Sequence, residues 1–141
     1  CYTAPFTPKP MTKAECEAQK SALGIKQCCS TDYCYNEDYW AGAVKQCGGV
    51  SKMPTMAQLA ELASQMYVGN PSLGATGRND IQYDPNSPAS KSLGLTPTFY
   101  LWSGEERSSR NANARSFDVT YSYWTYYSRK DWSNQAVCLG D

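Results

Sequence analysis

The chain has 141 residues, enough for one domain with its own hydrophobic core. Its 13 basic and 13 acidic side chains give a formal net charge of zero, which argues against a nucleic-acid or anionic-membrane partner. Histidine is absent, which excludes Ser-His-Asp and Cys-His catalysis and histidine metal ligands.

The first predicted helix follows an irregular amino-terminal stretch. Three prolines disfavour regular structure in residues 1–11. Thr12 and Glu15 form a capping box at the start of a helix near 13–23. Gly24 is suited to end this helix, because glycine readily adopts the left-handed backbone of a helix cap.

Seven cysteines indicate an oxidising, extracytoplasmic compartment and a disulfide framework. Zinc is the competing interpretation, but the cysteines of segment 25–36 lack a CxxC pair, and we expect neither a metal nor another cofactor. The predicted helix carries one cysteine toward the turn that follows it. We therefore expect the pairs Cys16–Cys28 and Cys1 with either Cys29 or Cys34.

The middle of the chain holds a second, clearer helix. Residues 37–47 fit either a short helix or a strand-like segment. Thr55 and Gln58 form another capping box at the start of a helix with one apolar face. That face, whose methionines we interpret as core residues, comprises Met56, Leu59, Ala60, Leu62, Ala63, Met66 and Tyr67.

Residues 69–94 are rich in glycine, proline, asparagine and aspartate, which predicts a long loop. Two clusters in it, 78–80 and 84–86, carry oxygen ligands that calcium accepts. Because they lack the EF-hand spacing, we interpret them as turn residues.

Short strands are predicted after Thr96, at 98–102, 114–119 and 135–139, with a turn at 103–106 and Phe117 facing inward. Segment 121–127 fits either a strand of alternating residues or an extended loop. Two main helices followed by a small, mostly antiparallel sheet with long loops form an α+β domain. We predict a single domain of 1–141, in which a disulfide-stapled segment of 1–36 precedes a core of 37–141.

Aromatic residues are concentrated near the carboxyl terminus. Ten of the 18 lie between Thr96 and Cys138, where they alternate with serine, threonine, asparagine and arginine. Such compositions are typical of recognition surfaces, because rigid rings supply contact area and small polar groups adapt their hydrogen bonds. The sequence therefore predicts a binding surface between Arg107 and Trp132.

Three motifs occur in a recurring order: KMPTMAQLAELA at 52–63, FYLWSGEE at 99–106 and QAVCLGD at 135–141. Over roughly 40–141 they resemble the C-type-lectin-like fold, in the bacterial branch related to formylglycine-generating enzymes. The carboxyl-terminal part is similar to the variable proteins of diversity-generating retroelements, including pilin-like ones. In that family the fold presents a hypervariable carboxyl-terminal region to a ligand.

The resemblance implies a disulfide between Cys47 and Cys138 and scaffold roles for Trp102 and Trp124. It implies a non-catalytic receptor or adhesin of bacterial or phage origin, extracellular or at the cell surface. Its ligand would be a protein or other macromolecule on a cell or virus surface. The outward, ligand-binding residues would be Arg107, Arg110, Asn111, Asn113, Tyr121, Tyr123, Thr125, Tyr126, Tyr127, Lys130, Asp131 and Trp132.

Three alternatives remain open. The first is a structural subunit of a pilus-like surface fibre, although no stretch of this chain is apolar and long enough to span a membrane. The second is a calcium-dependent carbohydrate-binding lectin, for which Asp131-Trp132-Ser133-Asn134 is only a partial counterpart of the sugar-binding motif. The third is a glycosidase using Glu105 and Glu106, which we disfavour because adjacent side chains on a strand point apart.

Overall fold

The computed structural model describes the backbone of residues 2–69, 77–78, 81–93, 98–118 and 122–140. Side chains within 67–83, 93–99 and 118–127 lie outside the described part. The helices are α1 (Lys13–Leu23), α2 (Thr31–Cys34), α3 (Tyr39–Cys47), the short 3-10 helix η1 (Val50–Lys52), α4 (Met56–Met66) and α5 (Pro88–Leu93). The strands are β1 (Tyr67–Gly69), β2 (Gly77–Arg78), β3 (Ile81–Tyr83), β4 (Thr98–Glu106), β5 (Asn111–Asp118) and β6 (Ser122–Arg129).

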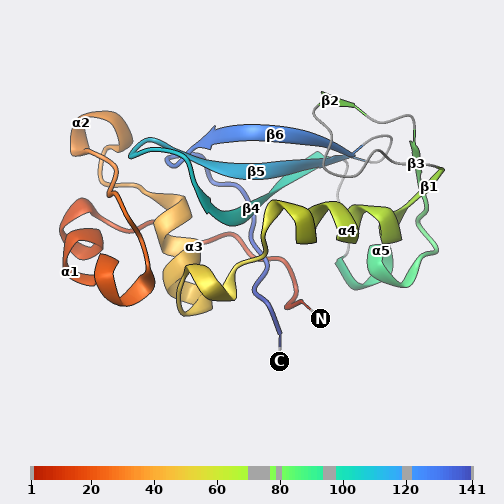
Figure 1. The fold of residues 1–141 in the computed structure, drawn as a ribbon, viewed down its shortest axis with the longest axis horizontal. Helices are drawn as coiled ribbons and strands as arrows, with labels where there is room; N and C mark the ends of the chain where they lie inside the picture. Colours follow the sequence, from red (N-terminus) through yellow and green to blue (C-terminus); the bar gives the residue numbers. More distant parts are fainter. Residues whose placement is uncertain (1, 70–76, 79–80, 94–97, 119–121, 141) are drawn as a thin grey trace.

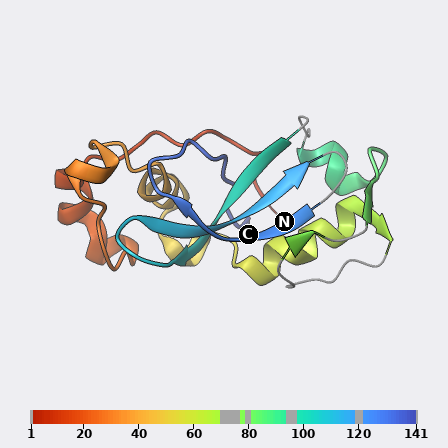
Figure 2. The ribbon, with the colours of Figure 1, turned by 90° about the horizontal axis from the view of Figure 1, so that it is seen from above.

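The fold is α+β, as predicted. An antiparallel sheet has the strand order β2-β6-β5-β4, and β1 pairs with β3 in a separate antiparallel pair. Helix α4 lies along one side of the sheet, while α1, α2 and α3 gather at one end of it (Figure 1). The view from above shows the same separation, with α4 and α5 near the opposite end (Figure 2).

Both predicted long helices form where their capping boxes place them. At α1, the Thr12 hydroxyl accepts from the Glu15 N–H at 3.2 Å, and Gly24 ends the helix with φ 79°. At α4, the Gln58 N–H donates to the Thr55 hydroxyl at 3.1 Å, and the Gln58 carboxamide accepts from the Thr55 N–H at 2.8 Å. Segment 37–47, for which two interpretations were open, contains helix α3.

Two apolar clusters form the described core. One packs α3 and the amino-terminal segment against β4 and β5, with Trp40 and Trp102 fully buried. The other packs the apolar face of α4 against Leu101, Phe117 and Val137, which confirms that Phe117 faces inward. The α4 methionines are buried in this second cluster, as expected of core residues.

Three disulfides join described residues. Cys16–Cys28 and Cys47–Cys138 are the pairs expected from the sequence. The third, Cys29–Cys34, differs from the expected pairing of Cys1 with one of these two cysteines. The reason is local, because the single turn of α2 brings Cys29 and Cys34 to a Cα separation of 5.9 Å. Cys1 lies outside the described residues.

The predicted turn at 103–106 is wrong, because β4 continues to Glu106. Within this strand, Gly104 allows a close approach of the backbone at Val50 and Pro54. Its N–H donates to the Pro54 carbonyl at 2.9 Å, and a Cβ built there would meet the Val50 carbonyl oxygen at 2.7 Å. A register shift between Trp102 and Glu106 accommodates this contact within the strand pair.

Two further expectations need correction. The loop at 69–94 is partly regular, because β1 pairs with β3 and α5 follows them. Segment 135–139 makes isolated bridges rather than a strand, pairing with Leu101, Phe6 and Tyr2. These bridges hold the first and last described residues together on the side of the sheet away from β6 (Figure 1).

Candidate functional site

Three chain segments distant in sequence meet at the end of the sheet beside α2 (Figure 1). They are the turn between β4 and β5, the residues that follow β6, and α2 with its flanks. The Lys130 N–H donates to the Arg110 carbonyl at 2.8 Å and so joins the first two. We name the solvent-accessible side chains here the α2-end surface; they are Tyr33, Tyr35, Arg107, Arg110, Arg129, Asp131 and Trp132.

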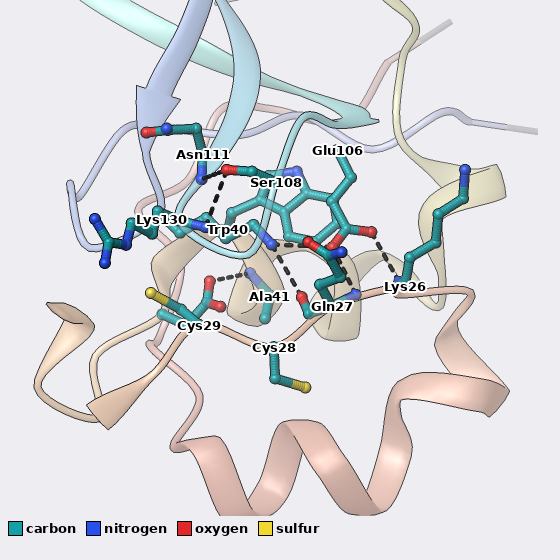
Figure 3. Close-up of polar contacts among 12 residues, drawn as sticks. Lys26, Gln27, Cys28, Cys29, Trp40, Ala41, Glu106, Ser108, Asn111 and Lys130 are labelled. Atoms are coloured by element: carbon teal, nitrogen blue, oxygen red, sulfur yellow. Dashed lines mark hydrogen bonds and ion pairs between the residues drawn. The ribbon is translucent and has the colours of Figure 1, made fainter. Parts of the chain in front are cut away.

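The turn that carries Arg107 and Arg110 is held by its own hydrogen bonds. The Ser108 hydroxyl accepts from the N–H groups of Arg110 and Asn111, both at 3.2 Å (Figure 3). The Asn111 carbonyl accepts from the N–H groups of Arg107 and Ser108, both at 3.0 Å. The Ser108 hydroxyl and the backbone carbonyl of Asn111 thus hold the turn and give the two arginines a defined backbone.

Tyr33 of α2 joins the third segment to this surface. The guanidinium carbons of Arg110 and Arg129 lie 4.4 Å and 4.7 Å from the centroid of its ring. These are cation–π distances. Arg129 also donates to both carboxylate oxygens of Asp131, at 3.0 Å and 2.7 Å, and this bond raises the pKa of Arg129 above its ordinary value.

Two large rings near this surface are strongly exposed. Tyr35 is 73% exposed and Trp132 is 47% exposed. The Trp132 N–H donates to the Arg129 carbonyl at 3.0 Å, and Tyr35 ends helix α2, whose Tyr33 ring contacts Arg129. Both rings therefore belong to the same end of the molecule.

Lys130 was predicted to face outward, and that prediction is wrong. Its side chain is fully buried, and its ammonium donates to the Glu106 carboxylate and to the Gln27 carbonyl, both at 3.0 Å (Figure 3). The ammonium also lies 4.7 Å from the centroid of the Trp40 ring. A cation this far from water requires such partners, because desolvation costs several kcal/mol. Lys130 therefore ties the amino-terminal segment to the sheet.

Glu105 and Glu106, the candidate catalytic pair, contact different structural elements. Glu105 accepts from the Met56 N–H at 2.6 Å, at the first residue of α4. Glu106 accepts from the N–H groups of Lys26 and Gln27 at 2.8 Å and 2.9 Å (Figure 3). The Glu105 carboxylate lies at a helix amino terminus, and the Glu106 carboxylate belongs to a buried ion pair. Both positions are explained by structural roles of these carboxylates.

Asp38 lies beside this ion pair and caps α3. Its carboxylate accepts from the Ala41 N–H at 2.8 Å, and the residue is buried. Burial raises the pKa of Asp38 from 3.8 to about 6, against the opposing effects of the Ala41 N–H and the Lys130 ammonium. The proximity of Glu106 raises this pKa further.

We expect Asp38→Asn to change how stability depends on pH. In the wild type, the raised pKa contributes stability that is present below pH 3.8 and is lost as the pH rises through about 6. Asparagine keeps an acceptor for the Ala41 N–H but cannot ionise. The wild type should therefore lose on the order of 2 kcal/mol relative to Asp38→Asn between pH 4 and pH 7.

Urea unfolding of both proteins across this pH range measures the difference. The matched control is Asp32→Asn, which also removes one carboxylate but at a solvent-exposed position. Parallel curves for Asp38→Asn and the wild type would mean that Asp38 is not the titrating group.

The remaining predicted ligand-binding residues divide into three groups. Arg107, Arg110 and Trp132 are exposed, whereas Asn111 and Asp131 are half-buried. Asn113 was predicted to face outward and is buried; its side-chain amide donates to Glu105 at 3.4 Å, and its backbone carbonyl accepts from the Ser103 hydroxyl at 2.7 Å. Outside the described residues or side chains are Tyr121, Tyr123, Thr125, Tyr126 and Tyr127, as is the side chain of the predicted scaffold residue Trp124.

Three members of the α2-end surface were not predicted: Tyr33, Tyr35 and Arg129. Tyr33 and Tyr35 flank Cys34 among polar residues, in TDYCYN, which repeats the aromatic and polar composition seen near the carboxyl terminus. That composition was the available signal. Only the packing of α2 on the turn and on the end of β6 shows that the two regions belong together.

Within the described residues, no group of three cysteine, aspartate or glutamate side chains is arranged to hold a metal ion. Asp84, from one of the two candidate calcium clusters, accepts from the Asn86 N–H at 3.0 Å, which is the geometry of a turn. No described helix combines the length and apolar character needed to cross a membrane. The three disulfides are compatible with an extracellular protein.

Comparisons of this chain with protein-family models, curated proteins and solved structures give no match. The features that bear on function are therefore the chain's own: exposed rings and arginines gathered at one end of a disulfide-bonded α+β domain.

Proposed function

We propose that the protein is a non-catalytic binding module that recognises a macromolecule on a cell or virus surface through the aromatic and polar residues near its carboxyl terminus. The observation that carries this proposal is the α2-end surface. There, Tyr35 and Trp132 are exposed beside Arg110 and Arg129. Tyrosine, tryptophan and arginine are the residues that dominate binding energy in protein interfaces.

A C-type-lectin-like scaffold is part of this proposal. It is supported by the α+β architecture and by the Cys47–Cys138 disulfide, which links α3 to the carboxyl-terminal segment. Such a bond holds the two ends of the core at a Cα separation of 5.3 Å. A scaffold closed in this way tolerates substitutions in exposed segments, because the buried clusters supply its stability.

We further propose that the carboxyl-terminal region is diversified by a retroelement, in an extracellular or surface-displayed protein of bacterial or phage origin. Sequencing of the surrounding DNA tests this part. A nearby reverse transcriptase and a near-copy of the 3′ end, differing mainly at adenines, would support it. A locus with neither would contradict diversification and leave the binding function to be decided by measurement.

We expect Trp132→Ala and Tyr126→Ala to weaken binding by at least about tenfold while leaving the melting temperature nearly unchanged. Trp132 is exposed, and an exposed ring contributes to contacts with a partner rather than to the core. The side chain of Tyr126 lies outside the described part, and its place in this prediction rests on the resemblance to variable proteins. Binding of the wild type to an array of purified surface proteins and glycans would identify targets, and titration would then give the affinity of each variant.

Two controls make the result interpretable. Trp102→Ala removes a fully buried ring and should lower the melting temperature strongly, whereas the exposed Gln65→Ala on α4 should change neither property. If Trp132→Ala and Tyr126→Ala unfold the protein or leave binding intact, the proposed function is wrong. Self-association that depends on Trp132, without binding to the array, would favour the fibre subunit.

A further inference from the structure

Of the three arginines in the α2-end surface, two lack a carboxylate partner among the described residues. Arg129 is paired with Asp131 in a bidentate contact. Arg107 and Arg110 form no ion pair with any described acid, including Asp32 and Glu37 of the α2 flanks. Arg110 is nevertheless held in place by its contact with the Tyr33 ring.

Tyr35 is presented by an unusual backbone. Tyr35 and Asn36 are consecutive non-glycine residues with positive φ, 52° and 61°. Such conformations cost free energy and persist only where the surroundings hold them. Here the Tyr35 N–H donates to the Thr31 carbonyl at 2.8 Å, and the Asn36 side chain accepts from the Lys13 N–H at 3.2 Å. The exposed ring therefore projects from a constrained backbone.

Constraint of this kind favours binding. A ring whose backbone is already fixed loses less conformational entropy when a partner covers it. The Cys29–Cys34 disulfide closes the short loop that contains Tyr33, and the Lys130–Glu106 pair anchors the preceding residues 26–27. The segment 29–36 thus combines exposure with order, which an incidental surface loop does not require.

The charges of the α2-end surface and its flanks indicate what kind of group it accepts. The three arginines and the exposed Lys26, which lines a small cavity with Arg107, are opposed by three carboxylates, those of Asp32, Glu37 and Asp131. A surface with a formal excess of one positive charge gives little extended positive field for a polyanion such as nucleic acid or a sulfated glycan. Of the two unpaired guanidiniums, that of Arg110 is fixed over the Tyr33 ring, on the surface that also carries the exposed Tyr35 and Trp132, and so suits a carboxylate with an apolar neighbour.

We propose that segment 29–36 is a second half of the ligand surface, and that its partner is a protein segment bearing an aspartate or glutamate next to an apolar side chain. The carboxylate binds Arg110, while Tyr35 and Trp132 contact the apolar neighbour. This inference rests on the proposed function but assigns binding to the amino-terminal segment, which the resemblance to variable proteins does not cover.

Selection from a phage-displayed library of random dodecapeptides tests the inference. The expected result is enrichment of peptides with aspartate or glutamate beside an apolar residue. A synthetic peptide of the most enriched sequence should bind Arg110→Gln and Tyr35→Ala at least about tenfold more weakly than the wild type. The exposed Lys45→Gln on α3 is the matched control and should bind as the wild type does.

A double-mutant cycle then tests the contact itself. Exchanging the acid of the peptide for its amide should remove the difference between the wild type and Arg110→Gln, because both partners of one interaction are then already absent. Thermal melts of each variant show that the fold persists. A difference that survives the amide exchange would overturn the assignment of the carboxylate to Arg110.

The other outcomes separate this inference from the proposed function. Binding that Trp132→Ala or Tyr126→Ala weakens, but that Tyr35→Ala and Arg110→Gln leave intact, would support a binding module and overturn the role of segment 29–36. Failure to enrich acidic peptides would also overturn the inference. Tyr35-dependent self-association in ultracentrifugation, or Arg110-dependent binding of heparin fragments, would show that the proposed partner class is wrong.

Discussion

Replacing Lys130 with methionine is expected to lower the free energy of unfolding by about 3 to 5 kcal/mol. Methionine retains much of the apolar stem, but it lacks the ammonium that lies 4.7 Å from the centroid of the Trp40 ring and leaves the buried Glu106 carboxylate without its cation. The Gln27 carbonyl also loses a donor. Urea denaturation followed by tryptophan fluorescence measures the loss.

The surface pair on α1 offers a matched control. Lys20 lies 3.1 Å from Glu17, and both side chains are more than one third exposed, so Lys20→Met should cost less than about 1 kcal/mol. The double variant Lys130→Met with Glu106→Gln should recover stability relative to Lys130→Met, because neither charge then remains buried alone. Equal losses for Lys130→Met and Lys20→Met would show that the buried pair contributes no more than a surface pair.

The burial of Lys130 also has a local consequence. Its ion pair with Glu106 fixes residues 26–27, which lead directly into the segment that carries Tyr33 and Tyr35. In Lys130→Met, amide hydrogen exchange should therefore accelerate in 25–36 more than in α4. The order of the α2-end surface thus depends on a side chain that does not itself belong to it.

Removing the Cys47–Cys138 disulfide is expected to destabilise the protein by about 4 to 5 kcal/mol on the chain-entropy model. The bond spans a sequence separation of 91 residues, so its loss releases most of the chain in the unfolded state. The variant Cys47→Ala with Cys138→Ala avoids a new free thiol. Thermal and urea unfolding under non-reducing conditions measure the effect.

The short Cys29–Cys34 loop supplies the comparison. Its sequence separation is only 5, so Cys29→Ala with Cys34→Ala should cost about 2 kcal/mol on the same model. Comparing the loss of stability on removing each disulfide tests whether loop length determines the size of the loss. A larger loss for the short loop would mean that packing around α2, rather than chain entropy, dominates.

The composition near the carboxyl terminus predicted a binding surface but not which side chains form it. Arg110 and Trp132 are exposed as expected, while Asn113 and Lys130 are buried by partners on other elements. A polar side chain in or just after a strand is interpreted as facing outward when its distant partner is unknown. Glu106 is the partner that reverses this interpretation for Lys130.

Local chemistry was enough to predict α1 and α4 from the sequence. Each begins at a capping box whose two residues lie three positions apart, and α4 adds an apolar face that repeats at helical spacing. These signals act within one or two turns of chain. The α+β class followed from the same kind of local pattern.

Tertiary structure alone decided how the amino-terminal segment takes part in the surface. The contacts that place it join residues 80 and 103 positions apart, from Glu106 to Lys26 and from Lys130 to Gln27. Such pairs form only after the chain has closed long loops, and no local spacing encodes them. The contacts of the Tyr33 ring with Arg110 and Arg129 therefore depend on long-range packing, and the residues next to Tyr33 in the sequence do not predict them.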